Sequence, residues 1–575
     1  MNRQRAGLLI FFLSPLLMPY LIYPRIIPFY TIPAFLLCLC AVLYSETRMV
    51  ERPTPLPVIP FALFLVLIGT IFVGFISHPF NSLGGNVEVP LLILISFIAF
   101  FCASANTIKV GTFYHLYLIA SIVWILISVP VWLGWTLGMP LFFDLWALTN
   151  DPTPKMNGPF TNGNVLSILI CVGWVFSTYY WMKYKFSYSW WILLTFLWIW
   201  IVSSMSRGAW VAQTVVLVWV IIYLLTNKSY RQLLYLLIAG LIAWVSGSAL
   251  VSFQQNQADQ TVPLAMQRQF TIPQQPARIV LWSTAFAIWK EHPWTGVGAG
   301  RIDAHFLDGQ AKALSHMDPS KHGLTSAFDS AHNLLLHLMA EHGVAGILTW
   351  FAISTFLASS IWRYRKRLLS IRWPALASAC VLWIQGMTNI SMTDPFPVLL
   401  FALLLGLSYA PRLRKGFSKE LYSLRPPNKY MAVFSGCLAA LLFFGAYKTT
   451  SVWLDFEKWI YMKPSPEKGR ASIQFVNRDD ILPYLVQTSV NEFKSTGNLA
   501  AIGNMKPLIL KALSAQQHPI LLRQLFYSYA VRGEFEQACE TGHFIEMQHW
   551  KDEANSDLYR AACKNRLTPS LNIQD

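Results

Sequence analysis

Long apolar runs, separated by short polar stretches, recur along most of the chain. Each run holds about 20 residues, the length that an α-helix needs to cross the hydrocarbon core of a bilayer. The pattern therefore predicts an all-α, polytopic membrane protein. We expect about thirteen membrane-spanning helices, over residues 7–23, 28–44, 57–76, 89–106, 112–137, 163–182, 188–204, 208–226, 232–253, 332–362, 374–390, 395–410 and 430–449.

Two stretches are too polar to lie in the bilayer, and they organise the chain. Residues 254–331 form a large loop within a membrane domain of residues 1–449, and residues 450–575 form a separate helical domain. The loop opens with a Gln-rich segment, Gln254 to Gln275, that we expect to be mobile. An amphipathic helix over residues 277–291 follows it.

The 450–575 domain contains a predicted helix pair over residues 518–548, with Gly533 at the turn. Aromatic and small residues recur there at helical spacing. The pattern is similar to a tetratricopeptide-type hairpin, although one unit alone does not establish a repeat array.

Composition and charge support the membrane interpretation. Only 13% of the residues are charged, compared with about 25% in soluble domains, which excludes a soluble enzyme. The net charge of +16 would suggest nucleic acid in a soluble protein. Here the basic residues concentrate in alternate loops between the predicted spans, for example from Arg363 to Arg372 and from Arg412 to Lys429.

Cytoplasmic loops of membrane proteins carry such an excess of Lys and Arg. We therefore expect a cytoplasmic N-terminus, with the 254–331 loop and the 450–575 domain on the outer side of the membrane. The charge reflects membrane orientation, and no nucleic-acid partner is expected.

Six of the eight cysteines lie inside predicted spans, where packing explains them. Cys539 and Cys563 fall in the outer domain, in an oxidising compartment. Two interpretations stay open: a disulfide between them, or two separate buried thiols. No Cys or His residues show the spacing of metal ligands, so neither a metal nor another cofactor is expected.

Four polar clusters fall at predicted outer ends of spans, where ionisable groups need a reason. The first is Ser204-Met205-Ser206-Arg207-Gly208-Ala209-Trp210, a tight turn that opens a helix. Arg207 stands at the positive end of the helix dipole, which is unfavourable for a cation. It binds either an anionic ligand or, by snorkelling, the lipid headgroup phosphates.

The second cluster combines Arg278 and Trp282 with a glycine-rich stretch from Gly296 to Arg301. No Lys-Ser/Thr pair follows the glycines, which excludes a nucleotide-binding P-loop. The glycines allow the backbone to approach a ligand closely. Arg278 and Arg301 can each grip phosphate oxygens through two hydrogen bonds. The alternative is a surface helix whose Trp side chains anchor it at the membrane interface.

The third cluster contains His332 near the start of a predicted helix. Asp329 or Ser330 is expected to be the N-cap, which puts His332 in the first turn. The positive helix end then lowers the pKa of His332 below about 6.5, so that the neutral imidazole can accept a proton. A structural hydrogen bond is the alternative role. Glu341 follows on the opposite helix face, and we expect it to tie this helix to a neighbour.

The fourth cluster runs from Asn157 to Asn164, at the outer entry of the 163–182 span. The amides of Asn162 and Asn164 can hold sugar hydroxyls. A capped transition from loop to helix explains the cluster almost as well.

Three of these clusters, in this order, resemble motifs of the bacterial O-antigen ligase and O-oligosaccharyltransferase superfamily. The resemblance covers residues 155–410. The matching residues are Ser206-Arg207-Gly208-Ala209-Trp210, then Arg278-x-x-x-Trp282 with Pro293-x-x-Gly296-x-Gly298, then His332-Asn333 with Ala340-Glu341-x-Gly343-x-x-Gly346.

The resemblance implies an inner-membrane glycosyltransferase that moves a glycan from undecaprenyl diphosphate to an acceptor hydroxyl, without a metal or a nucleotide sugar. It implies that Arg207 and Arg278 bind the diphosphate, with Arg301 as a further candidate, and that His332 takes the proton of the hydroxyl. A single displacement inverts the anomeric centre. Residues expected to support the substrate or the site are Asn162, Asn164, Trp282, Asp329, Asn333 and Glu341.

Within the superfamily the chain looks most like the pilin-type O-oligosaccharyltransferases, which carry a C-terminal periplasmic helical extension similar to residues 450–575. The expected acceptor is therefore a Ser or Thr of a pilin-like protein. The alternative is a lipid A-core ligase or an O-antigen polymerase that uses the same donor.

Two departures from the pilin-type pattern make a divergent mode of acceptor recognition the expectation. Residues 388–395 stand where many of these enzymes have His-Ser-x-x-Glu-Tyr-Pro, and Asn162-Gly163-Asn164 replaces Gln-Pro-Asn. A transporter fits less well, because the spans are nearly free of charge and show no internal repeat.

Overall fold

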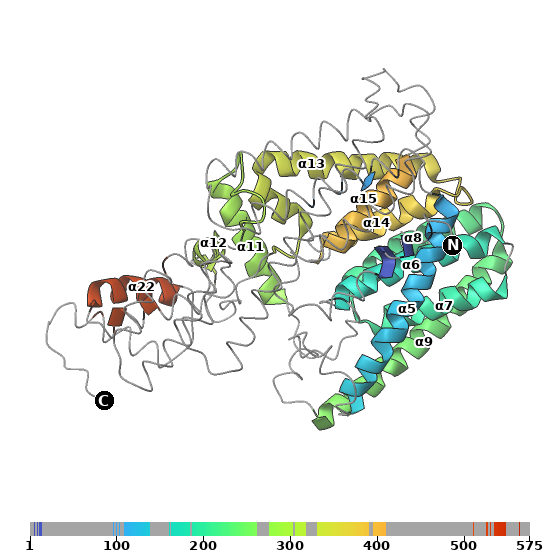
Figure 1. The fold of residues 1–575 in the computed structure, drawn as a ribbon, viewed down its shortest axis with the longest axis horizontal. Coiled ribbons are helices and arrows are strands. Elements are labelled where there is room, and N and C mark those ends of the chain that lie inside the picture. Colours follow the sequence, from blue (N-terminus) through green and yellow to red (C-terminus); the bar gives the residue numbers. More distant parts are fainter. Residues whose placement is uncertain are drawn as a thin grey trace, which may run out of the picture. The chain divides into compact units, whose positions relative to one another are not determined.

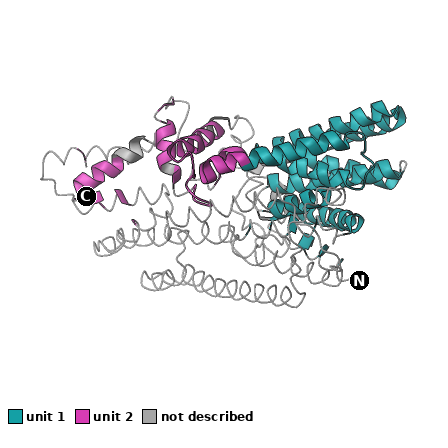
Figure 2. Cartoon of the chain, turned by 90° about the horizontal axis from the view of Figure 1, so that it is seen from above, with its two compact units in different colours: residues 1–65, 91–273, 349–443 teal, residues 66–90, 274–348, 444–575 magenta. Residues whose placement is uncertain are grey.

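The computed structural model resolves the protein as a set of helices in two compact units (Figures 1 and 2). Unit 1 comprises residues 1–65, 91–273 and 349–443, and unit 2 comprises residues 66–90, 274–348 and 444–575. The residues that the structure describes are 109–137, 160, 163–184, 187–261, 275–302, 305–314, 316–317, 330–389, 395–409 and 534–547, together with Arg5, 8–9, 11–13, Leu92, Ser96, 99–100, Ala103, Leu510, 525–526, 529–530 and Cys563.

Every regular element among these residues is helical, which confirms the predicted all-α class. Unit 1 contains α5 (Val110–Leu137), α6 (Gly163–Lys183), α7 (Tyr188–Ser203), α8 (Arg207–Thr226), α9 (Tyr230–Thr261), α14 (Trp373–Gly386) and α15 (Pro395–Tyr409). Unit 2 contains α11 (Gln275–Glu291), α12 (Phe306–Leu314) and α22 (Phe535–Met547). The long helix α13 (Leu334–Tyr364) begins in unit 2 and ends in unit 1.

The described helices agree with a multi-pass membrane protein. Five of them, α5, α6, α8, α9 and α13, are long and apolar enough to cross a membrane, and α7 and α15 are shorter apolar helices. Each coincides with a predicted span. The spans predicted over 7–23, 28–44, 57–76, 89–106 and 430–449 lie wholly or largely outside the described residues, so the total of thirteen stays a prediction.

The pattern of exposure on α8 is that of a lipid-facing helix. Its exposed apolar residues follow one another at steps of three and four, which puts them on one face of the helix. They are Val211, Val215, Val218, Ile222 and Leu225. Water does not favour such a stripe on a monomer, whereas lipid tails do.

In contrast, α6 lies at the centre of unit 1 and packs against α5, α7, α8 and α14. Close contact with α5 depends on a small residue, since a Cβ at Gly173 would come within 2.8 Å of the Ser121 hydroxyl. The Tyr117 hydroxyl of α5 also donates a hydrogen bond to the Leu169 carbonyl of α6, at 2.9 Å. This buried helix begins with the last residues of the fourth polar cluster, Gly163 and Asn164.

Helix ends that the loop charges place on the same side of the membrane also lie on the same side of unit 1. At one side of unit 1, the Tyr114 hydroxyl at the start of α5 donates to the Ile371 carbonyl and accepts the Ala375 amide at the start of α14. At the other side, the Gln385 side chain at the end of α14 donates to the Asn164 carbonyl at the start of α6, at 3.0 Å. Helices α5 and α14 therefore run in the same direction, and α6 runs in the opposite one. Which side is cytoplasmic stays a prediction.

Two sequence predictions about helix bounds were wrong. Helix α9 continues to Thr261, eight residues beyond the predicted end of the span at 253, so residues 254–261 are helical. Glutamine is a good helix former, and the hydrogen-bond ladder of α9 simply propagates through it. Helix α14 ends at Gly386, earlier than residue 390, and Met387 to Asn389 form turns.

In the C-terminal part, α22 coincides with the second helix of the predicted hairpin and packs against α12 within unit 2. The described residues of the first predicted helix are helical and buried, namely Leu525, Phe526, Tyr529 and Ala530. Gly533 lies outside the described residues, and the tetratricopeptide resemblance stays a prediction.

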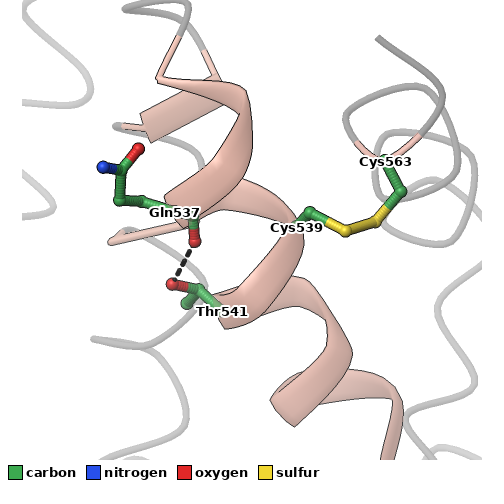
Figure 3. The surroundings of a disulfide bond; sticks show 4 residues. All are labelled: Gln537, Cys539, Thr541 and Cys563. Atoms are coloured by element: carbon green, nitrogen blue, oxygen red, sulfur yellow. Dashed lines mark hydrogen bonds between the residues drawn. A yellow bond between two sulfur atoms is a disulfide. The ribbon is translucent and has the colours of Figure 1, made fainter. Parts of the chain in front are cut away.

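A disulfide joins Cys539 of α22 to Cys563, with 4.9 Å between their Cα atoms (Figure 3). Of the two interpretations that the sequence left open, the structure has the disulfide. The bond closes a loop across a sequence separation of 24 residues.

We expect Cys539→Ser to destabilise the fold around α22. Closing a loop of this size stabilises a protein by about 3 kcal/mol in the chain-entropy model. In membranes, the variant should release C-terminal fragments under limited trypsin digestion faster than the parent chain does. Thr541→Ala on the same helix, which loses only an exposed hydrogen bond to the Gln537 carbonyl, should be cut at the parent's rate. Equal rates for the cysteine variant and the parent would contradict the prediction.

Candidate active site

His332 lies two residues before Leu334, the first residue of α13. The cap is Asn333, because its side-chain oxygen accepts a hydrogen bond from the Leu336 amide at 3.2 Å. The predicted N-cap was therefore wrong: Ser330 instead accepts the His332 amide at 3.2 Å, and Asp329 lies outside the described residues. His332 thus precedes the helix and is not in its first turn.

The backbone of His332 is in the left-handed region, with φ of +50°. This conformation is uncommon for a residue with a side chain and costs roughly 1–3 kcal/mol. It persists only where the surroundings overdetermine it. Such positions cluster at active sites, so the strain at His332 supports a functional role.

The preceding residue anchors His332 to the body of unit 2. Ala331 is only 1% exposed and belongs to a cluster with Ile288 of α11, Val297 and Ala340. The other members of the cluster are Ala285 and Ile302. Tight apolar packing on one side and the Asn333 cap on the other fix the backbone that carries the imidazole.

Helix α13 breaks at Gly343, whose φ and ψ are 57° and −138°. The break is joined to the loop after α11 by three backbone hydrogen bonds. The Val344 amide donates to the Pro293 carbonyl at 2.9 Å, the Val297 amide to Ala340 at 2.9 Å, and the Gly298 amide to Glu341 at 3.0 Å. We call residues 293–298 and 340–344 the loop–helix junction.

The junction explains the glycines of the second and third clusters. A Cβ at Gly296 would lie 2.3 Å from the Glu341 carbonyl group, and a Cβ at Gly343 would lie 2.5 Å from that of Trp294. Both have positive φ, a conformation that costs glycine little. The interpretation that these glycines bring the backbone close to a ligand is therefore replaced, for Gly296, by a close approach of backbone to backbone.

Glu341 is buried, with 3% of its surface exposed. Its carboxylate lies 3.5 Å from His337 Nε2 and 4.0 Å from His342 Nε2. These contacts are with its own helix, whereas its backbone carbonyl binds Gly298 of the junction. We expected the Glu341 side chain to link α13 to a neighbouring helix. Instead its backbone carbonyl binds the loop after α11, and its buried carboxylate lies beside the two imidazoles of its own helix.

The arginines of unit 2 differ in accessibility. Arg278 is half-buried near the start of α11, and Trp282 follows one turn later on the same face. Arg301 is 4% exposed, and burial lowers the pKa of its guanidinium, which still remains a cation at neutral pH. A phosphate on the surface would reach Arg278 more easily than Arg301.

The sequence interpretation missed a histidine pair that joins α11 to α12. The rings of His292 and His305 lie 5.6 Å apart. Burial lowers the pKa of His305, and His292 and Arg301 lower it further, whereas Asp308 and Glu291 oppose the shift. The signal in the sequence was the amphipathic pattern of residues 306–314, which predicts a helix that packs one face on a neighbour directly after His305.

In unit 1, Arg207 is exposed and opens α8, after the N-cap residue Ser206. The next residue, Gly208, packs closely on the end of α14 and the turn that follows, since a Cβ there would lie 3.1 Å from the Gln385 side chain and 2.5 Å from the Thr388 hydroxyl. Gln385 was also missed. As a polar residue inside an apolar run it was a usable signal, and it holds the Asn164 carbonyl.

The structure thus groups the predicted site residues within each unit. Asn164 and Arg207 belong to unit 1, and Asn162 lies outside the described residues. Unit 2 contains the others that are described, namely Arg278, Trp282, Arg301, His332, Asn333 and Glu341. No group of three or more potential metal ligands occurs among the residues that the structure describes.

Comparison with known proteins matches residues 191–351 to the family model described as O-antigen ligase. This stretch is an O-antigen ligase domain. It runs from α7 to the middle of α13 and includes every predicted arginine as well as His332. No curated protein matches the chain in a sequence search.

Together with the apolar helices, the domain implies a multi-pass membrane enzyme that transfers glycosyl groups. The family match and the apolar helices therefore confirm the predicted superfamily. They leave the pilin-type branch, the donor and the acceptor as proposals.

Gly343→Ala should destabilise the O-antigen ligase domain by opening the junction. The backbone conformation alone costs a non-glycine residue about 1–3 kcal/mol, and the new Cβ also meets the Trp294 backbone. The measurement is thermal unfolding in detergent. Gly111→Ala, where no atom lies within 4 Å of the added Cβ, is the matched control and should be neutral or slightly stabilising. The same melting temperature for both variants would refute the junction's role.

Acidification should weaken the packing of α12 on α11. The pKa of His305 is lowered from 6.5 in the folded protein, so the unfolded state binds the proton more tightly. The stability is therefore fully present above pH 6.5 and is lost as the pH falls below it. His305→Gln should lose less melting temperature between pH 7.5 and pH 5.5 than the parent, and His316→Gln, an exposed position, should behave like the parent. An unchanged acid sensitivity in His305→Gln would contradict the assignment.

Proposed function

We propose that the protein is an O-oligosaccharyltransferase of the bacterial inner membrane. It moves a glycan en bloc from undecaprenyl diphosphate to a Ser or Thr hydroxyl of a periplasmic pilin-like protein. The observation that carries the proposal is the strained, doubly anchored backbone of His332 within the O-antigen ligase domain. The N-terminus is cytoplasmic in this proposal, and the site and residues 450–575 are periplasmic.

The proposed reaction is a single displacement. His332 takes the proton of the acceptor hydroxyl as its oxygen attacks the anomeric carbon. The bond from that carbon to the phosphate oxygen breaks, its electron pair leaves with the lipid diphosphate, and the anomeric centre inverts. A fixed backbone supports this role, because a general base acts only within hydrogen-bond reach of the proton it removes.

The arginines supply the charge that the leaving group needs. The diphosphate gains negative charge as the bond breaks, and permanent cations stabilise it without taking up a proton. Arg207 and Arg278 are the accessible candidates, and Arg301 is a buried one. A guanidinium can bind two phosphate oxygens side by side, which also orients the lipid.

A protein acceptor is supported by the C-terminal helices. Helix α22 packs on α12 in the unit that carries His332, which adds folded surface beside the loop of the O-antigen ligase domain. A lipid acceptor does not require such a surface. The second candidate is transfer of O-antigen to lipid A-core, or its polymerisation, with the same donor. The family description, O-antigen ligase, favours the ligase activity.

The test uses cells that supply a lipid-linked glycan and a pilin. His332→Ala should reduce glycan transfer by at least about 100-fold, the usual contribution of a general base, as measured by the mass shift of the pilin. His316→Ala, an exposed histidine, should retain the parent's activity. Unaltered transfer by His332→Ala, at equal protein level, would refute the proposed base.

The acceptor is tested separately in a strain without lipid A-core. A pilin mass shift in that strain supports the protein acceptor. An unmodified pilin, together with glycan on lipid A-core in the complete strain, would support the ligase instead.

A further inference from the structure

Helix α13 changes character at the Gly343 break. None of the residues 334–343 is exposed. Beyond the break, exposed residues recur at steps of three and four along one face, at Leu348, Phe351, Thr355, Ala358 and Trp362. This stripe has the spacing of the lipid-facing stripe on α8. The membrane-embedded part of α13 therefore begins after the break.

The length of this part matches a bilayer. From Val344 to Trp362 the helix rises about 27 Å, and the hydrocarbon core is about 30 Å thick. At the far end the Arg365 guanidinium lies 3.4 Å from the centre of the Trp362 ring, and Trp beside Arg is typical of a membrane interface. The opposite boundary then falls at Val344, which belongs to the loop–helix junction.

Trp294 is at this boundary and is 78% exposed. Its backbone is held tightly, since the preceding carbonyl of Pro293 accepts the Val344 amide and only a glycine fits at position 343 beside it. A large indole on a fixed backbone, exposed at the level where the hydrocarbon ends, has the chemistry of an interfacial anchor. Its ring prefers the headgroup region, where the apolar part is covered and the N–H stays hydrated.

We propose that Trp294 binds the outer headgroup region of the bilayer and thereby sets the depth of the loop–helix junction. The part of α13 before the break then stands outside the hydrocarbon. It raises its first residue, Leu334, two residues after His332, by at most about 15 Å above the boundary. The lipid surface is the partner, and the anchored Trp294 determines how high the imidazole stands.

The consequence for transfer rests on the proposed function. The headgroup layer is about 5–8 Å thick on each side, so the diphosphate of a lipid-linked glycan lies below His332 and its first sugar lies nearer to it. With Trp294 anchored, the His332 imidazole would therefore stand at the height of the anomeric carbon, above the level of the phosphates.

Nitroxide labels in liposomes of phosphatidylethanolamine and phosphatidylglycerol measure the depth directly. The full-length chain carries Trp294→Cys, with Leu348→Cys as the lipid-facing control and Lys312→Cys as the exposed control on α12. The unsubstituted chain, labelled identically, gives the background of the native cysteines. Collision with oxygen relative to a water-soluble nickel chelate should give position 294 a depth between the two controls.

The proposal fails if the label at 294 resembles that at Lys312, which would indicate an indole in water, available to a glycan or a protein. It also fails if the label is as deep as that at Leu348, because the boundary would then lie elsewhere. Each variant is accepted only if its melting temperature matches the parent's, which excludes misfolding as a cause.

Activity separates this proposal from the proposed function. Trp294→Phe should keep the interfacial depth and most of the glycan transfer, whereas Trp294→Glu should lose transfer together with depth. If His332→Ala remains active while the depth of position 294 is intermediate, the proposed function fails and the anchor stands.

Discussion

The exchange of hydrogen bonds at the break in α13 is the constraint on which the O-antigen ligase domain depends. In an unbroken helix, the Val344 amide would bind the Ala340 carbonyl. Here the Val344 amide donates to the Pro293 carbonyl instead, and the Ala340 carbonyl accepts from the Val297 amide. Buried backbone groups need partners, so the helix breaks only where the loop replaces them, and the loop fits only because residue 343 is glycine.

The same exchange of hydrogen bonds also helps to position the catalytic candidate, His332. Val297 donates its amide to the junction while its side chain joins the cluster that buries Ala331. The neighbour of Ala331 is His332, whose left-handed backbone requires such support. In unit 1, Arg207 is likewise supported at a helix end, through the close packing of Gly208 on α14. Both groups thus owe their positions to backbone approaches that only small residues allow.

Local pattern was a good guide to the membrane helices and a poor guide to their ends. The apolar runs predicted α5, α6, α7, α8 and α15 nearly to the residue, because hydrophobic length is a property of the segment itself. The N-cap of α13 was missed, since Asp329, Ser330 and Asn333 are all good caps. The burial of Ala331 chose among them, and burial depends on residues distant in sequence. The end of α9 was placed too early because the apolar run stops at residue 253, whereas helix propensity continues the helix through the glutamines to Thr261.

The sequence by itself determined the all-α membrane class, the alternation of the spans and the superfamily, because hydropathy, loop charge and motif order are local quantities. It also supplied the arginines, His332 and the two cysteines of the tail as candidates. Only the tertiary structure decided what the glycines do, which residue caps α13, what the Glu341 carboxylate contacts and that Cys539 pairs with Cys563. Each of these depends on which backbone or side-chain atoms meet in space, and no pattern along one segment encodes that.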